Sequence, residues 1–201
     1  MLDARLRPRI DPLVNLIAGG LAAMGVTANG VSLAGFAIGL LAAWQIAEGA
    51  FIAGLLLGIL SRLCDALDGA VARRSGPTDF GGLLDIVLDF GFYGAIPLAF
   101  VLADPQANGL AGAILLLAFY VNGGSVLAFA LMLEKQGRAE DLRGGKALAF
   151  TQGLMEGTET FVFFALFCLF PTWFPFLAVI FALLTAVTTT ARLIRARATL
   201  R

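Results

Sequence analysis

The stretch 65-DALDGAVARRSGPTDFGGLLDIVLD-89 carries four aspartates, Asp65, Asp68, Asp85 and Asp89, that fall inside the apolar runs on either side of its centre. The chain of 201 residues is 59% hydrophobic and 14% charged, whereas a soluble domain is about 45–50% apolar and about 25% charged. Apolar stretches of about 17–25 residues, the length that crosses a bilayer, recur along the whole sequence. The sequence therefore predicts an all-α integral membrane protein with one domain over residues 1–201.

We predict six spanning helices from hydropathy and helix-breaking residues, at 30–47, 51–73, 80–103, 108–133, 148–169 and 173–193. Lysine and arginine concentrate in the N-terminal arm, in the second and fourth connections and in the C-terminal tail. The connections 46–50, 103–108 and 170–175 contain no basic residue. Because cytoplasmic loops are enriched in basic residues, we expect a multi-pass protein with both termini in the cytoplasm.

The first apolar run, Leu13 to Val26, differs from the six predicted spans. With about 14 residues it is too short to cross a bilayer, and spanning would carry the arginines at 5–9 across the membrane. Asp11 and Pro12 interrupt the run, which argues against a cleaved signal peptide. We therefore expect an amphipathic juxtamembrane helix at the cytoplasmic interface. The expected parts are a cytoplasmic arm with this helix at 1–28, a six-helix core at 29–197 and a tail at 198–201.

The four aspartates lie at similar depths on two successive helices. Counting back from the basic end of the second span at about 1.5 Å per residue puts Asp68 about 8 Å and Asp65 about 12 Å inside it. Asp85 and Asp89 lie about 8 and about 14 Å from the start of the third span. The short turn 74-RSGPTD-79 makes the two helices antiparallel neighbours. Since spacings of three and four residues share a helix face, all four carboxylates are expected to converge.

Four like charges inside a membrane need compensation, because one Asp near the centre of a membrane helix already costs about 2.5–3.5 kcal/mol on insertion scales. Arg62 supplies a single positive charge. Two divalent cations would supply four, and all-oxygen ligands suit Mg²⁺ or Mn²⁺. A salt-bridged helix pair is the structural alternative. Two cations clamp a diphosphate well, which indicates a nucleotide or prenyl diphosphate substrate at the cytoplasmic rim.

Other features of the composition narrow the function classes. The net charge is zero and no basic patch is interleaved with aromatic residues, so no nucleic-acid partner is expected. The chain has no histidine, and its two cysteines, Cys64 and Cys168, lie at different expected depths. We therefore expect no zinc site and no disulfide. Gly69 and Ala72 lie on or near the acidic face, where small side chains admit a ligand or allow close helix packing; the sequence leaves both open.

The opening stretch contains two patterns: D-x-x-D-G-x-x-A-R at 65–73 and G-x-x-x-D-x-x-x-D at 81–89. A spacer of seven residues separates them. The whole stretch resembles the signature of the CDP-alcohol phosphotransferase family, with a spacer one residue shorter than the family's usual eight. The resemblance implies six helices around a polar cavity open to the cytosol, usually in a homodimer. It also implies a phospholipid-biosynthesis activity: an alcohol displaces CMP from a CDP-linked lipid such as CDP-diacylglycerol, with Mg²⁺ or Mn²⁺ as the two bound ions.

The resemblance also implies roles for the matching residues. The implied metal ligands are Asp65, Asp68, Asp85 and Asp89, and Asp89 is also the implied general base. The implied contacts of the CDP diphosphate are Asp65, Gly69, Ala72 and Arg73. A general base is chemically reasonable because the acceptor alcohol must lose its proton as it attacks the phosphorus atom.

The segment 27-TANGVSLAG-35 is similar to the T-P-N-x-x-T start of the family's first helix. Ala28 replaces the proline and Ser32 replaces the second threonine. Asn29 is therefore expected either to contact the nucleotide or to cap the helix.

The acceptor alcohol is not assigned by the sequence. The run 84-LDIVLDFGFYGAIP-97 lacks the Pro and Lys of the L-D-P-x-A-D-K pattern of members that make phosphatidylglycerophosphate or cardiolipin. The sequence is most similar to bacterial members, which implies a bacterial inner membrane. Glu156 and Glu159 lie within the fifth predicted span, where they either recognise the acceptor or take part in hydrogen bonds between helices.

Two other functions use intramembrane acids. An aromatic prenyltransferase also binds a diphosphate through Mg²⁺, but its usual nine spans do not fit in 201 residues. A divalent-cation transporter needs polar residues along a whole pathway, whereas the predicted periplasmic halves are nearly all Leu, Ala, Phe and Val.

Overall fold

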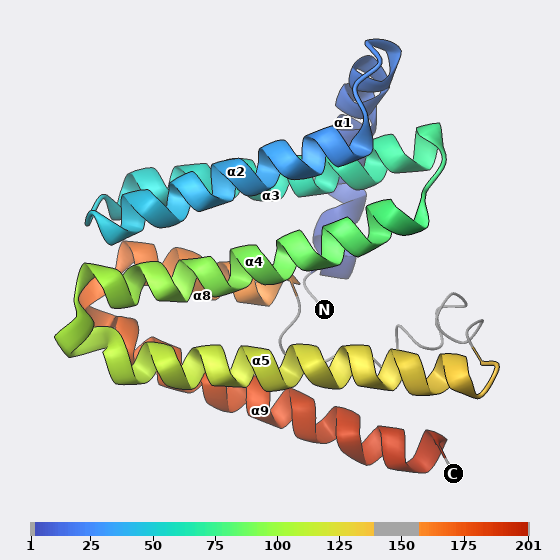
Figure 1. Ribbon diagram of the computed structural model, residues 1–201. Coiled ribbons are helices and arrows are strands. Elements are labelled where there is room, and N and C mark those ends of the chain that lie inside the picture. The colour runs from blue at the N-terminus through green and yellow to red at the C-terminus, as the bar shows by residue number, and fades with distance from the viewer. Residues whose placement is uncertain (1–2, 139–156, 201) are drawn as a thin grey trace.

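The computed structural model describes residues 3–138 and 157–200, with side chains from residue 11 onward. Within these ranges all regular structure is helical (Figure 1). The helices are α1 (Asp3–Ala23), α2 (Ala28–Ala47), α3 (Phe51–Ser75), α4 (Asp79–Ala103), α5 (Pro105–Lys135), α8 (Gly157–Leu169), the 3₁₀ turn η1 (Pro171–Trp173) and α9 (Phe174–Thr199). The all-α prediction is confirmed for this part of the chain.

Four segments are long and apolar enough to cross a membrane: α2, α4, α5 and Pro171–Thr199, which joins η1 and α9. α3 is long enough, but it carries Arg62 near its middle and Asp65 and Asp68 in its second half. The described part of α8 has 13 residues, and the rest of the fifth predicted span lies outside the described residues. Four of the six predicted spans are thus supported, and the total of six stays a prediction.

Hydroxyl and carboxylate side chains fix the starts of three helices. Thr27 Oγ1 accepts a hydrogen bond from Gly30 N at 3.2 Å at the start of α2, and Thr78 Oγ1 accepts one from Gly81 N at 3.0 Å at the start of α4. Asp104 caps α5 in the same way. Such caps satisfy backbone donors that have no partner within the helix. α3 ends where Gly76 adopts φ +93°, a conformation that favours glycine.

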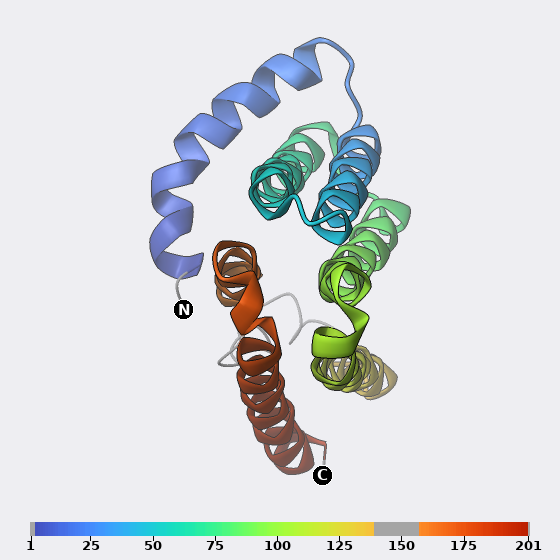
Figure 2. The same ribbon diagram turned by 90° about the vertical axis from the view of Figure 1, so that its left-hand side faces the viewer.

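α2 occupies the centre of the N-terminal half. It packs against both α3 and α4, while α5 packs on α9 and α4, and α8 packs on α3. α3 and α4 are antiparallel, but their backbones do not pack closely against each other, and Figure 2 shows α2 between them. The prediction that these two helices are antiparallel neighbours is confirmed only at their polar residues, which meet across the gap. The space between them holds the acidic residues.

The contact between α2 and α3 depends on small residues. Gly35 and Gly39 of α2 and Gly54 and Gly58 of α3 are all buried. A Cβ atom at Gly54 would lie 3.0 Å from Ala42 O, so the backbones approach as closely as glycine allows. This small-residue packing is common where helices associate in membranes.

α1 is longer than the predicted interfacial helix and begins ten residues before Leu13, at Asp3. It runs through Pro12 and curves around the bundle in Figure 2. Val14 and Ala18 are buried against Ala70 and Val71 of α3, because this face meets a neighbouring helix. The opposite face exposes the apolar side chains of Leu13, Leu16 and Ile17, as an amphipathic helix at an interface requires.

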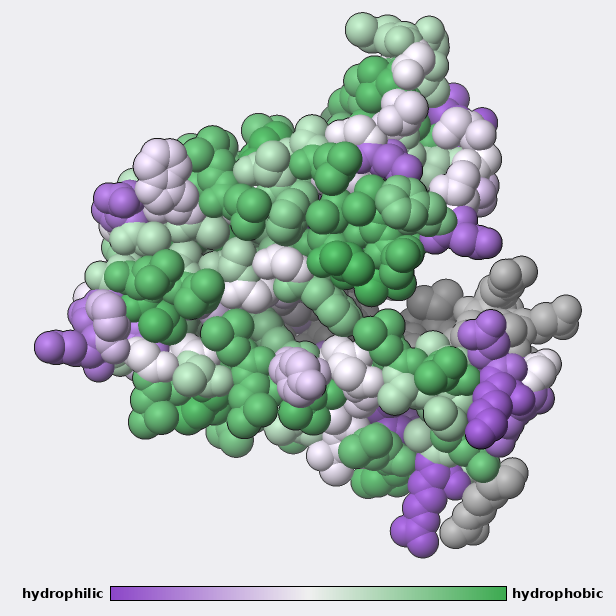
Figure 3. All heavy atoms as spheres, in the orientation of Figure 1, coloured by the Kyte–Doolittle hydropathy of each residue, from purple (hydrophilic) through white to green (hydrophobic). Residues whose placement is uncertain are grey.

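The core is aromatic and the surface is apolar. Phe100 stacks on Phe174 with ring centroids 4.7 Å apart, and Phe163 stacks on Phe181 at 4.5 Å. In Figure 3 hydrophobic residues cover most of the visible helix surface, and hydrophilic residues gather toward the ends of the helices. An apolar surface of this extent is typical of a protein that faces lipid.

Candidate active site

Three of the four predicted acids form a compact cluster. Asp65 and Asp68 come from α3 and Asp85 comes from α4, and each offers a carboxylate oxygen within 4.8 Å of those of the other two. Asp68 is buried and Asp65 is half-buried. Hard divalent cations prefer such all-oxygen sets of carboxylates. The donor set therefore fits Mg²⁺ or Mn²⁺, and it lacks the nitrogen and sulfur ligands typical of zinc.

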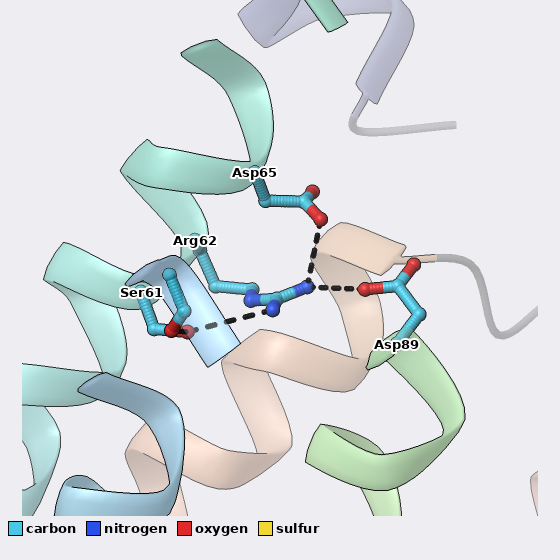
Figure 4. Close-up of polar contacts among 5 residues, drawn as sticks. Ser61, Arg62, Asp65 and Asp89 are labelled. Carbon is cyan, nitrogen blue, oxygen red and sulfur yellow. Dashed lines mark hydrogen bonds and ion pairs between the residues drawn. The ribbon is translucent and has the colours of Figure 1, made fainter. Parts of the chain in front are cut away.

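Asp89 lies beside this cluster and is bound by Arg62. Arg62 Nη1 donates to Asp89 Oδ1 at 2.7 Å and lies 3.4 Å from Asp65 Oδ1 (Figure 4). Arg62 therefore connects an acid of α3 with an acid of α4. The predicted convergence of four carboxylates is observed: Asp65, Asp68, Asp85 and Asp89 line one small pocket, in which Asp89 is also paired with a guanidinium.

Aromatic rings and a hydroxyl hold the Arg62 side chain. Its Cζ atom lies 4.0 Å from the ring centroid of Phe92 and 5.8 Å from that of Tyr93. Its Nη2 donates to Ser61 Oγ at 3.5 Å, and Ser61 Oγ donates in turn to Gly35 O at 2.8 Å. Cation–π contacts of this kind are strongest where water is excluded.

Phe92 and Tyr93 were not identified from the sequence as parts of the site. Their only signal is their spacing of three and four residues from Asp89, which places them on its face of α4.

A cavity of about 430 Å³ adjoins the acids between the starts of α2 and α4. Asp68, Asp85, Gly69, Ala72 and Asn29 line it. A Cβ atom at Gly69 would meet only Arg73 Nη1, at 3.5 Å, within 4 Å. Gly69 is therefore open to the cavity, and the Arg73 guanidinium lies beside it.

The N-termini of two helices border this cavity. Thr27 and Ala28 at the start of α2, and Thr78 and Gly81 at the start of α4, are among its lining residues. Free backbone N–H groups and the helix dipole make such termini favourable for anions. Here two helix N-termini lie next to three carboxylates that fit a cation. This combination suits a ligand such as a metal-bound diphosphate.

Asn29 does not cap α2, because Thr27 performs that role. Its Oδ1 atom lies 3.1 Å from the position that a Cβ at Gly81 would take. Asn29 thus lies against the start of α4 in the cavity wall. Of its two expected roles, contact with a ligand is the one that this position allows.

The predicted second acidic pair is described only in part. Glu159 is half-buried in the first turn of α8, and Glu156 lies outside the described residues. Cys64 and Cys168 are both free.

A family model for CDP-alcohol phosphatidyltransferases matches residues 25–191. The chain belongs to the CDP-alcohol phosphatidyltransferase family. It is accordingly an enzyme, and the matched region contains all eight fixed positions of the D-x-x-D-G-x-x-A-R and G-x-x-x-D-x-x-x-D pattern. This membership favours a phosphatidyltransferase over the two alternatives, a prenyltransferase and a divalent-cation transporter.

Individual relatives agree with the family assignment. This CDP-alcohol phosphatidyltransferase is 47% identical over 192 residues to the inner membrane protein YnjF of Escherichia coli K12, covering 96% of the chain and 93% of that relative. It is 38% identical over 88 residues to the archaetidylinositol phosphate synthase of Pyrococcus horikoshii, covering 43% of the chain and 46% of that enzyme.

Solved structures share the fold. The Mycobacterium tuberculosis phosphatidylinositol phosphate synthase PgsA1 with CDP-DAG bound has a TM-score of 0.67 at 21% identity, covering 92% of this chain and 94% of that one. The same synthase in complex with manganese and citrate has a TM-score of 0.65 at 21% identity, covering 92% and 88%. At this identity the likeness establishes the CDP-alcohol phosphatidyltransferase fold and nothing finer.

Proposed function

We propose that this transferase moves a phosphatidyl group from CDP-diacylglycerol to a small alcohol, with release of CMP, in phospholipid biosynthesis. One observation carries the proposal: the acids Asp65, Asp68 and Asp85 adjoin a cavity bordered by two helix N-termini. Structures of a protein with the same fold that contain CDP-DAG or manganese support it.

The acids would hold two ions of Mg²⁺ or Mn²⁺, with Asp65, Asp68 and Asp85 as ligands and Asp89 completing the set. Bound there, the ions would neutralise the diphosphate of the substrate and stabilise charge on the leaving CMP.

The cavity itself would bind the nucleotide half of the substrate. Backbone N–H groups at the starts of α2 and α4 would donate to diphosphate oxygens. Gly69 and Ala72 present almost no side chain toward the cavity, so the ligand can approach α3 closely. Arg73 beside Gly69 and Asn29 in the wall would orient the nucleotide.

Asp89 would act as general base. Its Oδ1 atom, to which Arg62 donates at 2.7 Å, would be the metal ligand, and Oδ2 makes none of the hydrogen bonds found among the described residues. That oxygen would take the proton of the acceptor hydroxyl as the new O–P bond forms. The P–O bond to CMP breaks in the same displacement, and CMP leaves with that electron pair.

A homodimeric state, a role of Glu156 and Glu159 in acceptor recognition and a location in a bacterial inner membrane belong to the same proposal. Each is supported by the family resemblance or by the position of charges in the sequence.

A membrane topology follows from the arrangement of the helix ends. The α3–α4 turn and the C-terminal ends of α5 and α9 lie at one end of the bundle in Figure 1, together with the cavity-lining starts of α2 and α4. The same end carries the basic residues Arg73, Arg74 and Lys135. We propose that this end faces the cytoplasm.

Cysteine labelling in intact cells tests this topology with two positions on one helix. Gln106 and Gln136 are exposed at opposite ends of α5. In a background of Cys64→Ser and Cys168→Ala, a membrane-impermeant thiol reagent is expected to label Gln106→Cys and to spare Gln136→Cys until the cells are lysed. Labelling of Gln136→Cys alone in intact cells would contradict the orientation.

The activity is tested by incubating the purified protein with CDP-diacylglycerol and a panel of alcohols. The panel contains glycerol 3-phosphate, serine, inositol, inositol phosphate and ethanolamine. We expect CMP release that requires one of these acceptors, stops when EDTA removes divalent ions and returns when Mg²⁺ or Mn²⁺ is added. Mass spectrometry of the lipid product identifies the acceptor. Equal CMP release in EDTA would contradict the proposed metal centre.

A further inference from the structure

Arg62 stands out as the only described cation that contacts the acid site through its side chain. Asp65, Asp68 and Asp85 each offer a carboxylate oxygen within 4.8 Å of those of the other two. Arg62 Nη1 lies 2.7 Å from Asp89 Oδ1 and 3.4 Å from Asp65 Oδ1, whereas neither Asp68 nor Asp85 has an ion pair among the described residues. The counter-charge therefore lies closest to Asp89, and Asp68 and Asp85 are left to a bound cation.

The position of Arg62 does not depend on Asp89 alone. Its guanidinium lies over the face of Phe92, and Ser61 links it to the backbone of α2. Its side chain is 19% exposed, compared with 37% for Asp65 and 30% for Asp89. Arg62 is thus packed into the wall of the site, unlike a solvated surface arginine that moves freely.

Arg62 and a divalent ion would compete for the same oxygens. Nη1 of Arg62 uses Asp89 Oδ1 and approaches Asp65 Oδ1. An ion that takes Asp89 as a ligand must weaken or replace this charge-assisted hydrogen bond, which belongs to the stronger class of hydrogen bonds in proteins. An ion that uses only Asp65, Asp68 and Asp85 meets Arg62 at Asp65 alone, in the longer contact of 3.4 Å.

We propose that Arg62 is the resident counter-ion of Asp89 and that it imposes an order on metal loading. Asp65, Asp68 and Asp85 would hold the first ion, and Asp89 would become a ligand of a second ion only when its contact with Arg62 is broken. Arg62 is then a positioning residue: without bound nucleotide it holds Asp89 in place and keeps the site singly loaded. The inference rests on the proposed function, because it concerns the same metal centre.

Mn²⁺ binding without nucleotide tests the order directly. Electron paramagnetic resonance of free Mn²⁺, combined with equilibrium dialysis, gives the number of ions and their affinities. We expect the wild-type protein to bind the first ion at least tenfold more tightly than the second, a gap of about 1.4 kcal/mol. In Arg62→Gln the gap should fall below threefold, and bound Mn²⁺ should raise the melting temperature more than in the wild type.

Arg74→Gln is the matched control. It removes the same charge from the same helix about 18 Å away, where Arg74 donates to Asn15 O of α1. Its titration should match that of the wild type. Should Arg62→Gln not yield folded protein, Arg62→Lys provides the test, because the shorter ammonium lacks the second nitrogen and should also narrow the gap.

The outcomes separate this inference from the proposed function. If the wild type forms CMP and binds two ions with equal affinity, or if Arg62→Gln and Arg62→Lys both titrate like the wild type, the inference about Arg62 is wrong and the transferase remains. An equal effect of Arg74→Gln would also overturn the inference, because the loss of one positive charge anywhere on α3 would then explain the change in Mn²⁺ binding. If the wild type neither binds Mn²⁺ nor forms CMP, the proposed function itself fails.

Discussion

Replacement of Asp89 by asparagine is expected to lower CMP formation about 100- to 10,000-fold, the usual contribution of a positioned general base. Asparagine keeps the shape of the side chain but cannot take the proton of the acceptor alcohol. It also gives up the charge that pairs with Arg62. The measurement is the initial rate of CMP release from CDP-diacylglycerol at saturating acceptor and Mn²⁺.

Asp79→Asn provides a control on the same helix. Asp79 lies in the first turn of α4, outside the lining of the cavity, and its charge contributes only about 0.3–1 kcal/mol at a helix start. This variant should retain CMP formation within about twofold of the wild type, since surface charges of this kind have small effects. If Asp89→Asn retained most of the wild-type rate, Asp89 would not be the base.

Replacement of Gly69 by leucine should lower kcat/KM for CDP-diacylglycerol about 100-fold, the scale of loss expected when a reacting group is displaced by about 1 Å. A Cβ atom at Gly69 would have only Arg73 Nη1 within 4 Å, and Gly69 lines the cavity, so a leucine side chain there would project into it. Leucine is also a better helix former than glycine by up to about 1 kcal/mol. The protein should therefore stay folded while its substrate no longer fits.

The control for this variant is Gly124→Leu on α5. Gly124 is exposed and has no neighbouring atom within 4 Å of an added Cβ. The Gly124→Leu variant has the same gain in helix propensity, but its new side chain does not enter the cavity. Both variants should melt at or above the wild-type temperature and should bind Mn²⁺ as the wild type does, but only Gly69→Leu should lose activity. Full activity in Gly69→Leu would place the nucleotide elsewhere.

Hydropathy predicted the long helices well, because burial in lipid gives a continuous apolar signal. The predicted spans 51–73 and 80–103 match α3 and α4 to within a few residues. The last span was predicted to end at 193, whereas α9 continues to Thr199. Its final turns carry Arg195 and Arg197 and lack the apolar signal, although nothing in them stops a helix.

Which helices pack against each other was harder to predict than where the helices lie in the sequence. A short turn between α3 and α4 suggested direct packing, yet α2 packs against both. Hydropathy predicts which segments enter the membrane, but it does not predict which of these helices pack against each other. The buried glycines of α2 and α3 were the available signal.

The acidic cluster could be predicted because helix periodicity fixes which side chains share a face. Asp65, Asp68 and Asp85 come together as that argument requires. The pairing of Asp89 with Arg62 could not be predicted in the same way. It depends on the direction of a long, flexible side chain, which is set by Phe92 and Ser61 rather than by sequence spacing.

The central position of α2 has a consequence for how this enzyme can vary. α2 contributes to the distance between the two acid-bearing helices, because it packs against both of them. A Cβ atom at Gly35 or Gly39, which carry no functional group, would meet Cys64, Ser61 or Phe92 around the site. Substitutions at these glycines would shift α3 and α4 relative to each other without replacing any acid. Catalytic geometry is thus adjustable from residues that take no part in the chemistry.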